Sequence, residues 1–360
     1  MNLLTLDVWS YVCDFIDRNT DRFNLIRTCR GLTKCNITFD ELIRLDQITN
    51  SGWYHYFTNI LIVYFVHPLP LNLKKITLYD YYNEPIIDIP FGVTHLALGR
   101  RFNNSCSSIP SSITHITFGD HFNCKINKLP PLTTHLMFGE NFNQYFDIPS
   151  SVTHLVFGKK FNRMIHIPSS IIFLEFGDYF NQPLILPSSV VSLKFGREFN
   201  QAIILPESLQ YLKFGNKFDQ PIKSVGIKQL ICGYNFNRSL DDLPTSLKKL
   251  KIGGAFNQSI NNLPSSVIHL SLGMFFKGSI ENIPSTVTHL TIPKYIDLSE
   301  HQIPSTVTHL TIHGQMYFHE ENIPGTITHL RIKGFIKEFY ANRITEMLPN
   351  VVCSFVGKLR

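Results

Sequence analysis

The sequence predicts a mainly β fold, in which a parallel β-solenoid of 18- to 20-residue coils follows a small α-helical domain. The main observation is a Phe-Asn pair that returns at this fixed period, which is typical of stacked repeats and not of a globule with one active site. A proline opens each period, and a short stretch of alternating residues follows it. The pairs begin at Phe102, Phe122, Phe142, Phe161, Phe180, Phe199, Phe236 and Phe256, and Phe218-Asp219 holds the same place in one unit.

Each period is predicted to contain one short strand. In a typical unit the residues from Thr153 to Phe157 alternate and are mostly β-branched or apolar, which indicates a strand of about five residues. Leu155 and its second neighbours point to one face, and His154 and Val156 point to the other. Glycine follows the strand in ten units, from Gly99 to Gly273. This column indicates either a positive φ or a close approach of two backbones.

The repeats set the predicted domain boundaries. Prolines open thirteen units and Ser224 takes that place in one more, so the solenoid has about 14 coils. In the last units Pro293 replaces the glycine and Ile296-Asp297 replaces the Phe-Asn pair, so these coils are expected to be looser or to act as caps. The predicted divisions are a helical domain at 1–50, a connector and N-terminal cap at 51–69, the solenoid at 70–334 and a C-terminal cap at 335–360.

The Phe-Asn pairs themselves are interpreted as structural. A column of phenylalanines, which Tyr82 extends, is expected to stack as a buried spine of rings. The turns of a parallel solenoid must satisfy their backbone N–H and C=O groups, and an Asn amide can connect one turn to the next.

The first 50 residues do not repeat and carry helical patterns. Apolar residues recur at helical spacing between Asp7 and Asp17, and a second stripe follows Asn19-Thr20-Asp21, which is typical of a helix start. A third short helix is predicted at about residues 40–45. Because so few short helices make a weak core alone, they are expected to pack on the first coils or on a partner.

Composition narrows the function classes. A formal charge of +6 over 360 residues does not call for a nucleic-acid or membrane partner. The seven cysteines include no C-x-x-C, and the N-terminus has no secretory pattern, so we expect reduced thiols and an intracellular location. The longest apolar run, Ile60 to Val66, is too short to span a bilayer and fits a buried strand or a cap.

The repeat pattern I-P-S-S-V-T-H-L-x-F-G-x-x-F-N-x-x-I resembles the FNIP repeat, a relative of leucine-rich repeats. Pairs such as Phe161-Asn162 followed by Ile167-Pro168 carry this resemblance, which covers about residues 68–334. It implies a leucine-rich-repeat-like parallel solenoid.

The N-terminal segment begins with Leu4-Thr5-Leu6-Asp7-Val8 and continues to Leu25-Ile26-Arg27-Thr28-Cys29-Arg30-Gly31-Leu32. This pattern resembles an F-box, although Thr5 stands where that family has proline. An F-box before FNIP repeats is known in proteins of amoebae and their large DNA viruses, and a viral origin implies a location in the host cytoplasm. The resemblance implies docking to the Skp-type adaptor of a cullin ubiquitin ligase, while the repeats hold a protein substrate. The alternative is a helical cap of the solenoid. The residues expected to dock the adaptor are Leu4, Leu6, Val8, Val12, Ile16, Leu25, Ile26, Cys29 and Leu32.

Histidine occupies one outward column in two blocks, which are His95, His115, His135 and His154, and then His269, His289, His309 and His329. The favoured interpretation is that each fills an exposed or half-exposed strand position. Binding through the sheet face and pH sensing remain alternatives. Metal coordination is disfavoured, because a straight ladder is not a tetrahedral cage and no Cys, Asp or Glu shares the column.

The outward columns depart from this rule in the middle units, where a partner is expected to bind. The alternative is drift among solvated positions. The predicted partner-binding face consists of Phe173, Glu175, Lys194, Tyr211, Lys213, Lys249 and Lys251.

Motifs for catalysis are missing from the sequence. It has no Gly-rich phosphate loop, no G-x-S-x-G and no H-E-x-x-H, and the paired acids of a glycosidase are absent from the outward columns. No cofactor and no metal are therefore expected. The sequence favours a non-catalytic adaptor that recruits a substrate to a ubiquitin ligase. The alternative is an interaction or structural scaffold without a ligase role.

Overall fold

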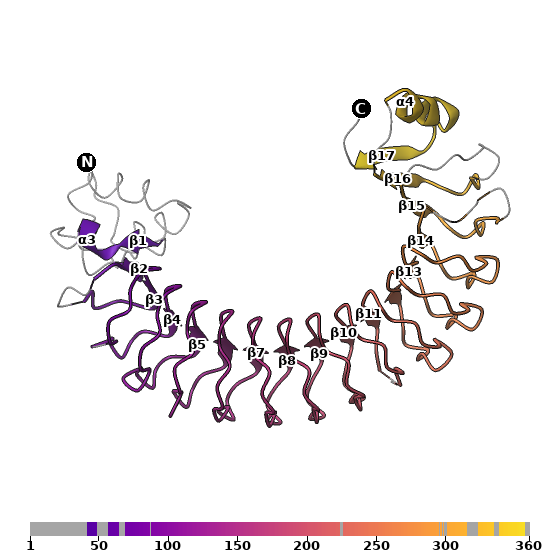
Figure 1. Cartoon of the computed structure of the whole chain (residues 1–360). Helices are drawn as coiled ribbons and strands as arrows, with labels where there is room; N and C mark the ends of the chain where they lie inside the picture. Colours follow the sequence, from indigo (N-terminus) through magenta and orange to yellow (C-terminus); the bar gives the residue numbers. More distant parts are fainter. Residues whose placement is uncertain are drawn as a thin grey trace, which may run out of the picture. The chain divides into compact units, whose positions relative to one another are not determined.

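A computed structural model gives the fold. It describes residues 42–48, 57–64, 69–86, 88–223, 226–294, 296, 298, 301–314, 323–334 and 338–356. The chain forms two compact units that divide between Gly158 and Lys159. Each unit stacks short parallel strands joined by irregular loops (Figure 1), so the predicted parallel β-solenoid of about 14 coils is confirmed.

The elements follow one another in a simple order. The first unit contains β1 (Ile43–Arg44), α3 (Leu45–Ile48), β2 (Asn59–Ile62), β3 (Lys75–Leu78), β4 (His95–Ala97), β5 (His115–Thr117), β6 (His135–Met137) and β7 (His154–Val156). The second unit contains β8 (Phe173–Glu175), β9 (Ser192–Lys194), β10 (Tyr211–Lys213), β11 (Gln229–Ile231), β12 (Lys249–Lys251), β13 (His269–Ser271), β14 (His289–Ile292), β15 (His309–His313), β16 (His329–Lys333), α4 (Glu338–Met347) and β17 (Val352–Val356).

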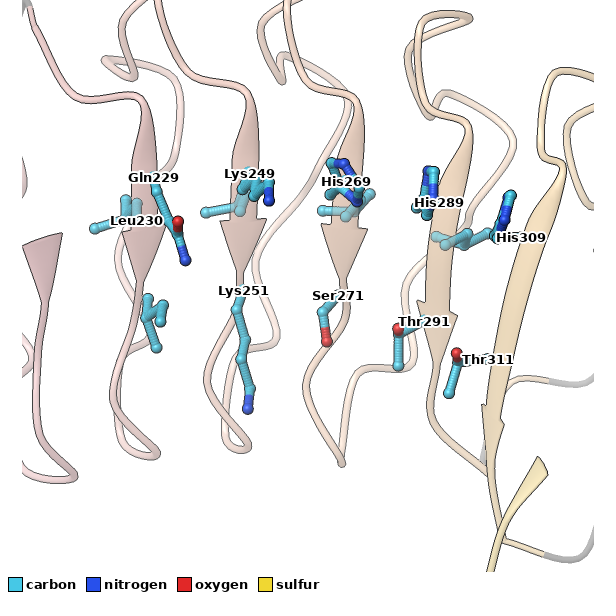
Figure 2. A pocket seen from close by; sticks show the side chains of 14 residues that line it. Gln229, Leu230, Lys249, Lys251, His269, Ser271, His289, Thr291, His309 and Thr311 are labelled. Carbon is cyan, nitrogen blue, oxygen red and sulfur yellow. The ribbon is translucent and has the colours of Figure 1, made fainter. Parts of the chain in front are cut away.

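Within each unit, consecutive strands pair in parallel with a shift of one repeat. Lys249 therefore lies beside His269, which lies beside His289 (Figure 2). The same register aligns the buried leucines, such as Leu250 and Leu270. Because every residue has its equivalent from the next coil beside it, a column of the sequence repeat becomes a straight row in space.

Most strands are shorter than the five residues expected. β7 has three residues, His154–Val156, and excludes Thr153 and Phe157. The carbonyl of Thr134 accepts both Thr153 N, at 2.9 Å, and His154 N, at 3.0 Å. A regular ladder does not give two successive amides to one oxygen, so the strand begins only after the threonine.

In the coils whose strand is followed by a phenylalanine, the core holds two interleaved rows of aromatic rings. In the second unit Phe180, Phe199 and Phe218 are fully buried, with ring centroids 6.0 and 6.1 Å apart. The phenylalanines that follow β8, β9 and β10 insert between these rings, as Phe195 does at 3.7 Å from Phe199. The predicted spine of rings is confirmed, and it is double along this part of the chain.

The glycine column marks a close approach of two backbones. A Cβ atom at Gly215 would lie 1.8 Å from the carbonyl oxygen of Gly196 in the preceding coil. Among the described glycines only Gly314 and Gly334 have a positive φ. Of the two explanations that the sequence offered, close approach is therefore the correct one for this column.

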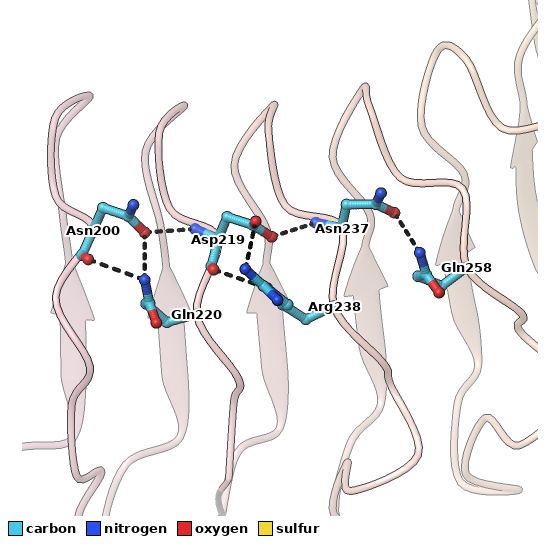
Figure 3. Close-up of polar contacts among 6 residues, drawn as sticks. All are labelled: Asn200, Asp219, Gln220, Asn237, Arg238 and Gln258. Atoms are coloured by element: carbon cyan, nitrogen blue, oxygen red, sulfur yellow. Dashed lines mark hydrogen bonds and ion pairs between the residues drawn. The ribbon is translucent and has the colours of Figure 1, made fainter.

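The asparagine column forms a ladder of side-chain to backbone hydrogen bonds. Asn200 Oδ1 accepts the backbone N–H of Asp219 at 2.9 Å, and Asp219 Oδ1 accepts that of Asn237 at 3.0 Å (Figure 3). Arg238 pairs with the Asp219 carboxylate at 3.0 Å, where other units have a glutamine. The predicted connection between turns is confirmed. The asparagines lie at the surface of the coils, whereas the phenylalanine rings are buried in the core.

Removing one link of this ladder is expected to destabilise the solenoid. Asn162 Oδ1 accepts Asn181 N and Gln182 Nε2, both at 3.0 Å, so Asn162→Ala leaves two donors without this acceptor. We expect a loss of about 1–2 kcal/mol in the free energy of unfolding, measured by urea denaturation. Asn162→Asp is the matched control, because Asp219 shows that a carboxylate fills the same role. Equal stability of the alanine variant and the wild type would contradict the ladder.

A second ladder was not foreseen from the sequence. In most coils the second residue after the proline has a hydroxyl that donates to a carbonyl of the preceding coil, as Ser189 Oγ does to Ile171 O at 2.7 Å. Thr286 does the same to Val267 O at 2.8 Å. This hydrogen bond explains why the column accepts only serine or threonine in these coils.

Ordered strands extend beyond the FNIP-like segment at both ends. β2 lies in the predicted connector and pairs with β3. In the predicted C-terminal cap, β17 follows α4 and pairs with β16. The nine residues predicted to dock an adaptor lie outside the described residues.

Candidate binding face

The predicted partner-binding residues all project from one face of the second unit. Phe173 and Glu175 come from β8, Lys194 from β9, and Tyr211 with Lys213 from β10. Lys249 and Lys251 come from β12, one strand further along. They occupy the first and third positions of these strands, whose middle leucine is buried, so they lie on the surface opposite the core.

The structure brings three of these residues into direct contact. Lys194 Nζ lies 2.9 Å from Glu175 Oε2 and 5.1 Å from the centre of the Phe173 ring. Both charged side chains are about one-third exposed, so solvent screens the ion pair and its net stabilisation is modest. The pair neutralises the one carboxylate that the outward positions of β8–β16 contain.

Three lysines on this face remain uncompensated. Lys213, Lys249 and Lys251 are exposed, and none has an ion pair with another described residue. Beside them, the half-buried side chains of Tyr211 and Ile231 add aromatic and aliphatic surface. A mixture of apolar area and unpaired positive charge is suited to a partner with negative charge.

The histidines form two ladders, one in each unit. Ring centroids from His95 to His154 are 4.0–4.2 Å apart, and those from His269 to His329 are 4.1–4.3 Å apart. All these residues except His329, which is exposed, are partly buried. The prediction of exposed or half-exposed strand positions is therefore confirmed.

A threonine fixes the orientation of most of these rings. Thr114 Oγ1 donates to the carbonyl of Thr94, at 3.2 Å, and lies 2.8 Å from His115 Nδ1. Because a hydroxyl has one proton, Nδ1 must donate the second of these bonds, and neutral His115 presents an unprotonated Nε2 to the outside. Because the rings are stacked, the Nε2 lone pairs of successive histidines point in parallel directions and do not converge on one point. Among the described residues no group of three His, Cys, Asp or Glu side chains is placed to hold a metal ion.

The ladder of the first unit makes stability depend on pH. Burial and the neighbouring histidines lower the pKa values of His95, His115 and His135, and nearby Lys75 lowers those of His95 and His115 further. Near pH 6 the unfolded chain therefore binds more protons than the folded chain, and stability falls as the pH drops below about 6.5. We expect a lower melting temperature at about pH 5.5 than at about pH 7.5, and a smaller difference for His115→Gln/His135→Gln. Equal melting temperatures of the wild type would contradict this effect.

The two buried cysteines, Cys106 and Cys232, are poor nucleophiles. Burial raises the pKa of the Cys106 thiol to about 12 and raises that of Cys232 further. Both thiols are therefore protonated at neutral pH and do not supply the thiolate that nucleophilic catalysis needs.

A protein-family model matches the repeats of this chain. The FNIP Repeat model matches residues 82–121, 107–141, 122–160, 161–198, 199–227 and 236–275, which together make up more than half of the chain. The chain belongs to the FNIP repeat family. The predicted FNIP resemblance is thus confirmed, and the F-box resemblance stays a prediction.

Solved structures extend this result to the fold. The FNIP chain aligns with CroV588, whose crystal structure is that of a novel circular LRR protein, at 30% identity and a TM-score of 0.60 over 84% of this chain. The chain spans 56% of the length of CroV588. YopM from Yersinia enterocolitica WA-314 aligns at 15% identity and a TM-score of 0.44, over 76% of this chain and 63% of YopM. No curated protein sequence matches the chain. The alignment with CroV588 shows that the FNIP solenoid is leucine-rich-repeat-like, as predicted.

The FNIP coils also carry a groove that the sequence did not predict. It crosses β11–β15 on the outward face, with a volume of about 290 Å³, and Lys249, Lys251 and His289 are among its lining residues (Figure 2). The departure at Lys249 and Lys251 was visible in the sequence. The continuation of the groove along the histidine block was not visible in the sequence, because the residues at those positions follow the repeat.

The helices of the described FNIP chain do not meet the requirements of a membrane-spanning segment. Across the ranges that the structure describes, no helix combines the length and the apolar character needed to cross a bilayer.

Proposed function

We propose that this FNIP protein is a non-catalytic adaptor that binds a protein partner on the outward face of β8–β12. The observation that carries the proposal is the departure of this face from the repeat, where Phe173, Tyr211 and three unpaired lysines replace the His-Thr pattern. Positions that do not serve the stack are free to serve a partner, and repeat proteins bind on such extended surfaces.

We further propose that the adaptor is the substrate-recognition subunit of a Skp-cullin-F-box-type ubiquitin ligase. The F-box-like line at residues 4–32 supports this role, with Leu6, Val8 and Ile26 among the residues that would dock the Skp-type adaptor. The role implies an intracellular location. The free state of the four described cysteines agrees with a reducing compartment.

A pull-down with a purified Skp-type adaptor tests the ligase role. We expect the full-length chain to retain the adaptor, and Leu6→Glu/Val8→Glu to lose it while the melting temperature of the repeats is kept. A chain without residues 1–45 provides a second comparison. If the full-length chain fails to bind, the ligase role is wrong and a scaffold without ubiquitin chemistry takes its place.

A charge-reversal experiment tests the binding face. We expect Lys213→Glu/Lys249→Glu to reduce the proteins captured from cell extract by about tenfold, or about 1.4 kcal/mol, because both lysines lose their attraction for a negative partner. Lys160→Glu/Lys277→Glu is the charge-matched control, since both of its lysines are exposed in the same unit and lie outside this face. Equal capture by the wild type and the face variant would count against the face.

A further inference from the structure

The groove across β11–β15 has two walls that run along the solenoid, perpendicular to the strands (Figure 2). Strand pairing in register aligns the first strand positions as one wall and the third positions as the other. The first wall runs from Lys249 through His269 and His289 to His309. The second runs from Lys251 through Ser271 and Thr291 to Thr311.

The groove is positively charged at β12, one strand from its β11 end. Lys249 and Lys251 are both exposed on the outward face of β12, two residues apart. The outward positions of β9–β16 hold no Asp or Glu, and the outward Glu175 of β8 is paired with Lys194, so no outward carboxylate of these strands is paired with Lys249 or Lys251. A ligand that places carboxylates over β12 therefore meets two cations and no repulsion.

The second wall offers a row of hydroxyl groups. The side chains of Ser271, Thr291 and Thr311 are partly buried, and they form no hydrogen bonds with other residues that the structure describes. They contrast with the Ser and Thr residues that precede the strands, which bond to the preceding coil. These outward hydroxyls are free to donate to the carbonyl oxygens of a ligand.

The first wall offers an acceptor. Thr308 Oγ1 donates to Thr288 O at 3.3 Å and lies 2.9 Å from His309 Nδ1, so Nδ1 carries the proton and Nε2 of the neutral ring accepts. A peptide backbone supplies the N–H donor that this atom needs. A nucleic-acid backbone presents phosphate oxygens, which are acceptors only, and satisfies this wall poorly.

We propose that the groove binds an extended acidic segment of a partner protein. Its carboxylates lie over Lys249 and Lys251, and its backbone runs between the histidine and hydroxyl walls towards β15. Three strand spacings of about 4.8 Å separate β12 from β15, a distance that about four or five extended residues cover. This inference rests on the proposed adaptor function and names the chemistry of the recruited partner.

Fluorescence anisotropy with a labelled hexaglutamate peptide and the full-length chain tests the proposal. We expect binding by the wild type, and a loss of about tenfold or more in affinity for Lys249→Glu/Lys251→Glu. The charge-matched control Lys160→Glu/Lys277→Glu should keep the affinity within about twofold. Thr291→Val, which changes no charge, should weaken binding by a smaller factor, because the peptide loses one hydroxyl donor. Melting temperatures establish that each variant is folded.

Three results would overturn the acidic groove. The first is that the wild type does not bind hexaglutamate, and the second is that the two double variants lose the same factor in affinity. The third is that an oligothymidine of equal charge binds more tightly than hexaglutamate, and that this binding disappears in Lys249→Glu/Lys251→Glu. None of them bears on adaptor docking, which the pull-down tests separately. The capture experiment on the face of β8–β12 shares Lys249 with this test and also reverses Lys213, which lies outside the groove.

Discussion

Gly215→Ala is expected to destabilise the second unit by about 3 kcal/mol or more. The added methyl carbon would lie 1.8 Å from Gly196 O and 2.3 Å from Gly196 C, distances at which neither backbone can remain in place. The contact atoms belong to the main chain, so no side-chain rotation relieves them. The two coils must separate, and the strand ladder between β9 and β10 loses its hydrogen bonds.

Hydrogen exchange locates this effect. We expect the amides of the coils around Gly196 and Gly215 to lose protection in the variant, together with a lower urea midpoint for the whole chain. Gly325→Ala is the matched control, because nothing lies within 4 Å of a Cβ at that position. That variant should be neutral or slightly stabilised, since alanine restricts the unfolded chain. If the two variants were equally stable, close packing of the glycine column would be refuted.

Period and polarity were enough to predict the stack and the direction of most side chains. A strict repeat means that one column has one environment, so an apolar column such as that of Phe199 must face the core and a column with His154 or Lys249 must face outward. The amide ladder followed from the need to satisfy turn backbones, which is a property of any coil stack.

The sequence did not predict contacts that depend on the precise relative positions of atoms in neighbouring coils. Strand length is set by the carbonyl of Thr134, which accepts two successive amides, and no sequence pattern records this. The Ser189 hydroxyl reaches a carbonyl 18 residues earlier only because of the path of the loop. The second row of rings inserts into the first at a depth that packing alone decides.

The sequence predicted which residues form the candidate binding face, but it did not predict the groove that continues from this face along the histidine block. The departures at Phe173 and Lys251 stand out against the repeat, and the pair between Glu175 and Lys194 follows from a register shift of one unit. The groove needed the structure, because Thr291 and His309 obey the repeat and become part of a site only through their position beside Lys249 and Lys251.

Phe199→Ala is expected to cost about 3–5 kcal/mol, the range for a large aromatic side chain removed from a core. The Phe199 ring is fully buried and lies between equivalent rings, 6.0 Å from Phe180 and 6.1 Å from Phe218. It also stacks at 3.7 Å on Phe195. The loss removes contacts on both sides of one coil, and hydrogen-bonded neighbours hold the coils too firmly to close the cavity.

In a repeat protein such a cavity weakens an interface between neighbouring units as well as one unit. The unfolding transition of Phe199→Ala should therefore broaden or split, since coils on the two sides of the cavity no longer unfold together. Phe275→Ala is the matched control, because that ring lies in the same unit and is 42% exposed, and its loss should cost about 1 kcal/mol or less. A Phe199 variant that unfolded as steeply and at the same urea concentration as Phe275→Ala would show that the ring spine does not couple the coils.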